Sequence, residues 1–286
     1  MLVNMKEMLR EAEVRKIAVG GFNCATLESA RAAVAAAEAM NMPFILQHAE
    51  VHEEYIPLEL AGPIMITLAQ NAKVPVCVHL DHGSSLEYVT RALRLGFTSV
   101  MYDASGKSFE ENAAETATVV RMAHAVGATV EAELGNMPHN LKGEMELSEY
   151  KPEDFYTVPE DAKKFVDLTG VDALAISFGT VHGVYKATPK LNFDIVRKVR
   201  QAVGELPLVM HGGSGLSQED YHTAIACGIR KINYYTYEAM AGGRGTYQVV
   251  KDKPEGLQFH DVAMKATEFM TEDVKRAIRL FMGEKV

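Results

Sequence analysis

The chain has 286 residues, of which 48% are hydrophobic and 23% are charged, and its formal net charge is −9 at pH 7. This composition is typical of a soluble globular protein with enough apolar material for a large core. The negative charge argues against a general affinity for nucleic acid or for an anionic membrane, so we expect a small molecule as the partner.

The three cysteines are widely spaced and none belongs to a Cys-x-x-Cys pair; they are Cys24, Cys77 and Cys227. The pattern favours reduced core thiols over a disulfide framework or a cysteine zinc site. Residues 1–13 form an amphipathic helical pattern with acidic residues throughout, and no apolar run approaches the length of a membrane span. We therefore expect a cytoplasmic protein.

Short β-branched runs alternate with longer helical patterns along the whole chain, which is typical of parallel βα units. Eight strands are predicted, at 16–22, 43–48, 74–80, 98–103, 129–134, 172–178, 207–212 and 229–234. Helical patterns lie between them, for example at 27–40, 85–96, 109–127 and 193–204, and several end at glycine. Eight units fit a closed α/β barrel, the (β/α)8 or TIM barrel, better than an open sheet. We predict one such domain over residues 1–286.

The longest polar interruption covers residues 136–159, after the fifth predicted strand. Loops of this length inside a compact domain are usually functional or mobile. We interpret this segment as a lid over the site.

Histidines follow three different predicted strands, as His82, His182 and His211. In this type of barrel the active site lies at the carboxyl ends of the strands, and three imidazoles with an open fourth position are typical of catalytic Zn²⁺. A single histidine at a strand end is more often structural, so the pattern alone leaves both interpretations about equally favoured. Asp81 adjoins the first histidine and could move a proton. For His48 and His79 a structural role, or one that supports the metal ligands, is favoured.

Glycines follow two of these histidines. Gly183 comes directly after His182, and 211–215 reads HGGSG, with Gly212, Gly213 and Ser214. Barrel phosphate sites commonly use the loops after strands seven and eight, where Asn233 and Thr236 also lie. Turns require glycine too, so this cluster alone is weak. Beside a divalent metal it would suit chemistry on a carbonyl or hydroxyl near a phosphoester.

Seven segments resemble, in order and spacing, the class II metal-dependent fructose/tagatose-bisphosphate aldolases, in particular their ketose-bisphosphate branch. They are FN (22–23), HLDH (79–82), SVMYDAS with FEEN (99–112), VEAELG (130–135), GTVHGVY (179–185), LVMHGGSGL (208–216) and GIRKIN (228–233). The resemblance covers nearly the whole chain.

The resemblance implies a (β/α)8 barrel with one Zn²⁺ per subunit on His82, His182 and His211, and it leaves room for a monovalent cation. It implies that Asp81 acts on the C4 hydroxyl and that Glu133 is an alternate metal ligand. The phosphate of dihydroxyacetone phosphate would be held by Gly183, Gly212, Gly213, Ser214, Asn233 and Thr236. The implied reaction is reversible aldol cleavage of a ketose phosphate, and a homodimer or homotetramer is typical.

Three departures from the family pattern concern the half of the substrate that becomes the aldehyde. The eighth-strand motif reads NYYT, with bulky Tyr235; the second strand is followed by QHAEVHE, beginning at Gln47; and the lid is replaced by NMPHNLKGEMELSEY, leaving Glu144 and Glu146 as candidate acid–base groups. We expect Gln47 and Tyr235 at the aldehyde end. The hypothesis that follows is an aldehyde other than glyceraldehyde 3-phosphate, unphosphorylated or carrying another anion.

Three other functions stay open. A Schiff-base aldolase would need a lysine inside the barrel, for which Lys231 is the candidate. A metal-dependent sugar-phosphate isomerase or epimerase could use the same enediolate without breaking a carbon bond. A non-catalytic sugar-phosphate binder is favoured only by the replaced lid.

Overall fold

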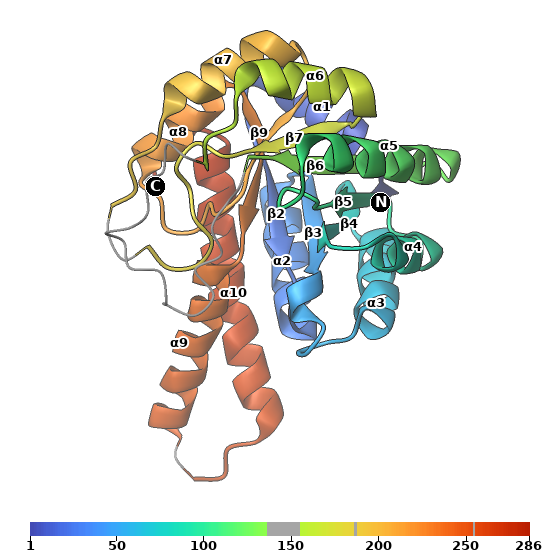
Figure 1. Cartoon of the computed structure of the whole chain (residues 1–286). Helices are drawn as coiled ribbons and strands as arrows, with labels where there is room; N and C mark the ends of the chain where they lie inside the picture. The colour runs from blue at the N-terminus through green and yellow to red at the C-terminus, as the bar shows by residue number, and fades with distance from the viewer. Residues whose placement is uncertain (136–154, 186–187, 254) are drawn as a thin grey trace.

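A closed ring of eight parallel strands surrounded by helices forms the body of the protein (Figure 1). The computed structural model describes residues 1–135, 155–185, 188–253 and 255–286. The ring consists of β2 (Val19–Asn23), β3 (Phe44–Ala49), β4 (Val76–Gly83), β5 (Ser99–Tyr102), β6 (Thr129–Leu134), β7 (Ala173–Ile176), β8 (Leu208–Met210) and β9 (Ile229–Tyr234). Pairing of β4 with β5 and of β2 with β9 closes the ring, so the predicted (β/α)8 barrel is confirmed.

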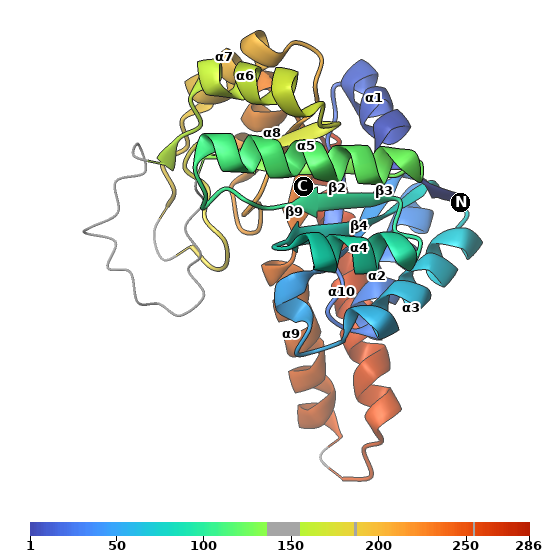
Figure 2. The same cartoon turned by 45° about the vertical axis from the view of Figure 1, so that its right-hand side comes forward.

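Helices separate the strands and cover the outside of the barrel (Figures 1 and 2). They are α1 (Met5–Arg15), α2 (Leu27–Met40), the 3-10 helix η1 (Glu50–His52), α3 (Leu58–Asn71), α4 (Leu86–Arg94), α5 (Phe109–Ala125), α6 (Pro159–Thr169), α7 (Phe193–Val203), α8 (Gln218–Cys227), α9 (Thr236–Asp252) and α10 (Phe259–Phe281). Reciprocal capping boxes at Thr26, Ser108 and Ser217 satisfy the free backbone N–H groups that begin α2, α5 and α8. None of the described helices is both long enough and apolar enough to cross a membrane.

The first barrel strand begins later than the predicted range 16–22. Lys16 ends α1 in the left-handed conformation, with φ of 54°, and its N–H bonds back to Ala12 and Glu13. This C-cap geometry turns the chain before it can extend, so β2 starts at Val19. A further two-residue strand, β1 (Leu2–Val3), pairs with Val76 and Cys77 of β4. It was not predicted, because two residues carry no readable period.

An antiparallel pair of helices, α9 and α10, extends well beyond the barrel and forms an arm (Figures 1 and 2). Close approach is enforced at Gly245, where a Cβ would lie 2.7 Å from the carbonyl oxygen of Lys265. Large apolar side chains stand exposed along the arm, among them Tyr247, Phe259 and Met264. The sequence prediction of eight βα units did not include this arm.

One buried acid at the root of the arm has a predictable effect on stability. Glu238 is 1% exposed, and neither carboxyl oxygen has a hydrogen-bond partner among the described residues. Burial, and after it the charge of Asp273, raises the pKa of Glu238 well above its usual value. The folded state therefore holds this proton more tightly than the unfolded chain, and folding stability falls as pH rises above about 4.3.

Replacing Glu238 with Gln keeps the shape and removes the titrating proton. We expect Glu238→Gln to be more stable than the wild type at about pH 8, by roughly 1 kcal/mol or more, and to lose most of this advantage near pH 5. Guanidinium denaturation at both pH values measures the difference, with the exposed Glu284→Gln as control. An advantage that does not change with pH would contradict the assignment.

Candidate active site

A cavity of about 220 Å³ opens at the carboxyl ends of the barrel strands. It is lined by Asn23, Ala49, Val51, His52, Asp81, His82, His182, Gly183, Gly212, Gly213, Ser214, Asn233, Tyr234, Tyr235 and Thr236. Side chains from β2, β3, β4, β9 and the loops after β7 and β8 thus share one space. Most residues singled out from the sequence meet here, although they are far apart along the chain.

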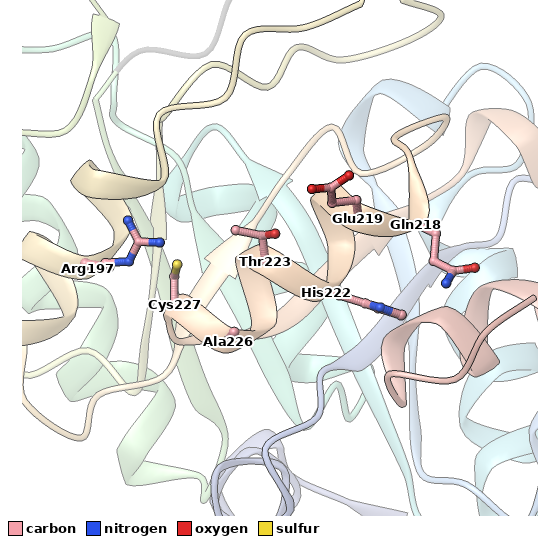
Figure 3. A pocket seen from close by; sticks show the side chains of 7 residues that line it. All are labelled: Arg197, Gln218, Glu219, His222, Thr223, Ala226 and Cys227. Atoms are coloured by element: carbon pink, nitrogen blue, oxygen red, sulfur yellow. The ribbon is translucent and has the colours of Figure 1, made fainter.

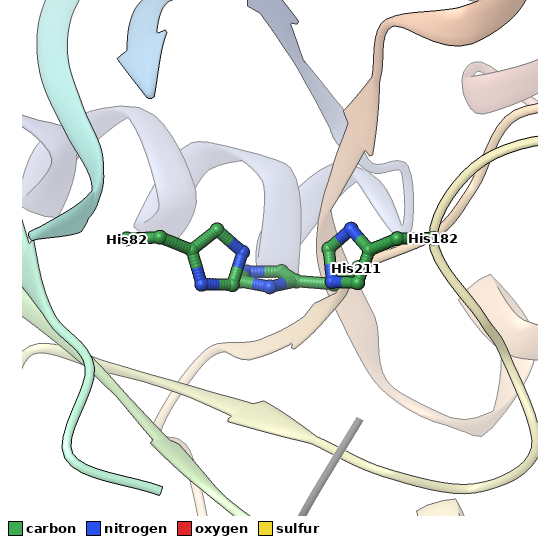
Figure 4. A group of neighbouring side chains, drawn as sticks. All are labelled: His82, His182 and His211. Carbon is green, nitrogen blue, oxygen red and sulfur yellow. The ribbon is translucent and has the colours of Figure 1, made fainter. Parts of the chain in front are cut away.

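Three imidazoles converge beside this cavity, from the end of β4 and from the loops after β7 and β8 (Figure 4). One ring nitrogen each of His82, His182 and His211 lies within 4.8 Å of the others. The ring centroids are 4.7 to 5.9 Å apart and the ring planes are nearly perpendicular, at 71° to 72°. Such a cluster of nitrogen donors is the ligand set of a catalytic zinc site.

Carboxylates hold the outer nitrogens of two of these rings. Asp103 Oδ2 lies 2.7 Å from His82 Nδ1, and Glu131 Oε1 lies 2.8 Å from His211 Nε2. The other ring nitrogens, His82 Nε2 and His211 Nδ1, are not engaged by these two carboxylates. Carboxylates in this position orient metal-binding histidines and increase their basicity.

The backbone at His82 is bent specifically to present this side chain. The pairing of β4 with β5 shifts register between Leu80 and Gly83, which is a β-bulge, and His82 lies in the left-handed region with φ of 52°. A Cβ at Gly83 would lie 2.9 Å from the carbonyl oxygen of Met101, so only glycine fits there. Bulges commonly redirect a side chain at a functional site, and a left-handed histidine is strained.

The electrostatic field under the histidines favours a cation. Burial lowers the pKa of His211, but the side chains of Glu131 and Glu133 more than reverse this and raise it to about 10. His211 Nδ1 has no hydrogen-bond partner among the described residues and lies 3.3 Å from Glu133 Oε2. A divalent ion would meet the same carboxylates and the same inward nitrogens, so the residues present fit a metal. Glu133 also forms a second candidate group with His82 and Asp103.

Lys231 compensates one of these charges from inside the barrel. Its Nζ is fully buried and donates to Glu131 Oε2 at 2.7 Å, and this ammonium helps to lower the pKa of Glu131 to about 2, against the effect of burial. Lys231 does not line the cavity. An amine that is paired as an ammonium below the site is not placed to attack a substrate carbonyl, which disfavours Schiff-base chemistry.

Asp81 is fixed by two amide side chains. Asn23 Nδ2 donates to Oδ2 at 2.7 Å, and Asn233 Nδ2 donates to Oδ1 at 2.9 Å. Burial would raise the pKa of Asp81, but the positive field of His82, His211 and Lys231 holds it well below its usual range. Asp81 is therefore ionised and oriented in the cavity. Asn23 had not been assigned a role from the sequence, although it directly follows the predicted strand 16–22 and ends the observed β2.

Gln47 lies behind the cavity wall. It is fully buried, does not line the cavity, and its Nε2 donates to Asn23 Oδ1 at 3.2 Å, so it supports the amide that holds Asp81. His48 and His79 are also fully buried, in polar contact with Tyr88 and Ser99 respectively, as their structural interpretation requires.

The loops after β7, β8 and β9 form one edge of the cavity, and its backbone geometry is suited to an anion. Ser214 Oγ accepts the N–H groups of Tyr235 and Thr236 at 3.1 Å each, which anchors it at the N-terminus of α9. Gly212 has φ of +64°, and a Cβ there would lie 2.4 Å from the carbonyl oxygen of Val181. The loop can therefore lie close to its neighbour and leave room for a ligand, while the helix N-terminus favours negative charge.

Glu144 and Glu146, which the sequence analysis assigned to a lid, lie outside the described residues.

A second hollow, of about 570 Å³, opens on the outer surface between α7 and α8 (Figure 3). It is lined by Arg197, Gln218, Glu219, His222, Thr223, Ala226 and Cys227, all from helices or their ends. Although larger, it lacks the convergent groups of the strand-end cavity, which remains the candidate active site.

Comparison with known proteins agrees with this geometry. Residues 3–285 match the family model described as "Fructose-bisphosphate aldolase class-II". The fructose-bisphosphate aldolase of Staphylococcus aureus (strain Mu50 / ATCC 700699) is 39% identical over 285 residues, which is 98% of this chain and 97% of the relative. The fructose-bisphosphate aldolase of Geobacillus stearothermophilus is 42% identical over 258 residues, or 88% of this chain and 87% of that one.

Among solved structures, the YdjI aldolase from Escherichia coli K12 is similar with a TM-score of 0.86 and 35% sequence identity. The similarity covers 98% of this chain and 97% of the other. With a family match over nearly its whole length, the chain belongs to the class II fructose-bisphosphate aldolase family of lyases.

Proposed function

We propose that this protein is a zinc-dependent aldolase that reversibly cleaves a ketose phosphate into dihydroxyacetone phosphate and an aldehyde. The observation that carries the proposal is the convergence of His82, His182 and His211 beside an oriented Asp81 in one cavity. A divalent ion held by the three histidines would polarise the substrate carbonyl and stabilise negative charge on its oxygen. Glu133 is near enough to serve as an alternate ligand.

Asp81 is the group that moves the proton. In the cleavage direction, its carboxylate takes the proton of the C4 hydroxyl while the C3–C4 bond breaks and its electron pair passes toward the carbonyl. The enediolate that remains takes up a proton from water at C3 to give dihydroxyacetone phosphate. In the reverse direction the same group returns the proton to the new hydroxyl. The two amides on Asp81 keep it aligned before the substrate arrives.

The phosphate of dihydroxyacetone phosphate is held at the edge of the cavity formed by the loops after β7, β8 and β9. Gly183, Gly212 and Gly213 allow backbone N–H groups to approach it closely, and Ser214, Asn233 and Thr236 line the same space. In this proposal the substrate carbonyl lies beside the three histidines, and the wall made by Ala49, Val51, His52 and Tyr235 receives the aldehyde half.

The aldehyde half of the substrate is proposed to be other than glyceraldehyde 3-phosphate. Among the described residues that line the cavity, none is a lysine or arginine that could pair with a second phosphate. The wall beyond Asp81 is made instead by Ala49, Val51, His52 and Tyr235.

An isomerase or epimerase acting at the same site would produce one sugar from one sugar. Detection of two carbon fragments as products therefore distinguishes an aldolase from these enzymes.

Removal of the metal should abolish cleavage. We expect activity on fructose and tagatose bisphosphates, or on other ketose phosphates, to disappear after EDTA treatment and to return with Zn²⁺. Mass spectrometry should find one zinc per chain. His182→Ala should weaken zinc binding by more than about 100-fold, since the loss of a mere supporting contact costs about 10- to 100-fold. The exposed His260→Ala is the matched control, and full activity without metal would refute the proposal.

Replacement of Asp81 by Asn should stop carbon–carbon chemistry without emptying the metal site. We expect Asp81→Asn to reduce kcat by about 100- to 10,000-fold, which is the usual effect of losing a proton-transfer group. Zinc content should stay at the wild-type level, because Asp81 is not one of the three converging ligands. The exposed Asp167→Asn is the control. A rate within threefold or so of the wild type would exclude the assigned role.

We also propose a homodimer or homotetramer. The support is the arm, on which Tyr247, Phe259 and Met264 are 70%, 83% and 67% exposed. Light scattering should give two or four times the 31.4 kDa of one chain. The double variant Phe259→Glu with Met264→Glu should lower this mass, whereas Val14→Glu, an exposed apolar position on α1, should not. A wild-type mass of 31.4 kDa would overturn the proposal.

A further inference from the structure

His52 is a polar side chain in the cavity wall that the proposed chemistry does not use. It ends η1, directly after β3, and it is 5% exposed. Its ring packs against Tyr235, with ring centroids 4.6 Å apart and planes at 45°, and Tyr55 lies on it at 5.9 Å. Because β2 lies between β3 and β9 in the barrel, His52 and Tyr235 together bridge the end of β2.

The imidazole of His52 retains unused hydrogen-bonding capacity. No hydrogen bond joins either ring nitrogen to another described residue, and Nδ1 is buried. Burial lowers the pKa of His52, and the charge of Asp81 offsets this only in part. The ring is therefore neutral near pH 7 and offers one donor and one acceptor.

A neutral donor and acceptor suits a hydroxyl group, which both donates and accepts a hydrogen bond, whereas a phosphate dianion offers acceptors only. The phosphate edge lies at the loops after β7, β8 and β9, and Asp81 marks the reacting hydroxyl. What remains of the wall is Ala49, Val51, His52 and Tyr235. Two of these are apolar, and the packing of the His52 ring against Tyr235 fixes its plane.

We propose that His52 determines specificity by forming a hydrogen bond with a hydroxyl group on the aldehyde half of the substrate. The substrate class is then a ketose 1-phosphate whose distal part is polyhydroxylated and uncharged. This inference rests on the proposed aldolase function. His52 is unused by the metal site, so its substitution leaves the histidine cluster intact.

The test compares two uncharged aldehydes in the synthetic direction, glyceraldehyde and propanal, each with dihydroxyacetone phosphate. His52→Phe keeps an aromatic ring against Tyr235 and removes both nitrogens. We expect it to reduce kcat/KM for glyceraldehyde about tenfold, the effect of losing one net hydrogen bond, and to change that for propanal by less than about twofold. His52→Gln, whose amide reaches about as far as Nε2, should recover part of the loss.

Deuterium exchange at C3 of dihydroxyacetone phosphate separates this inference from the proposed function, because the exchange needs no aldehyde. Wild type and His52→Phe should exchange at equal rates. An equal loss with both aldehydes, or no loss with either, would overturn the role of His52. A higher kcat/KM of the wild type for glyceraldehyde 3-phosphate than for glyceraldehyde would also overturn this inference. Absence of both exchange and aldol addition in the wild-type zinc form would instead overturn the aldolase proposal itself.

Discussion

The buried ion pair between Lys231 and Glu131 is the interaction on which the site depends. Both side chains are fully buried, and Glu131 in turn holds the outer nitrogen of His211. Removing one partner of such a pair typically destabilises a protein by about 3 to 5 kcal/mol, because the other charge is left uncompensated. The ammonium of Lys231 compensates the charge of the carboxylate that orients His211.

Paired charges also explain how Asp81 and His82, which are adjacent in sequence, both contribute side chains to the cavity. Two amide donors orient Asp81, and the charges of His82, His211 and Lys231 keep it ionised. His82 Nδ1 lies on Asp103, and His82 Nε2 lies 4.0 Å from Asp81 Oδ1. A continuous strand would place residues 81 and 82 on opposite faces. The bulge and the left-handed backbone at His82 let both side chains reach one cavity.

Strand periodicity and the ends of strands predicted the barrel and most of the cavity lining, but they did not predict its supporting contacts. Glu131 and Glu133 are two residues apart on β6, so both face the inside of the barrel, and this spacing is visible in the sequence. Asn23 and Asp103 could not be assigned in the same way, because their roles arise from register between strands distant in sequence. Gln47 was expected at the aldehyde end; its side chain bonds to Asn23 behind the cavity wall and does not line the cavity. His52 lies on a short 3-10 turn, whose direction no period encodes.

Helix α9 begins at Thr236, which lines the substrate cavity, and continues outward as one half of the arm. One continuous helix therefore joins the candidate active site to the arm, on which Tyr247 stands exposed (Figure 2). In the proposed oligomer, a subunit contact on the outer half of α9 would be made by the same helix whose first turn borders the cavity at Tyr235 and Thr236. Sequence changes in the arm would then bear on the acceptor half of the cavity as well as on assembly.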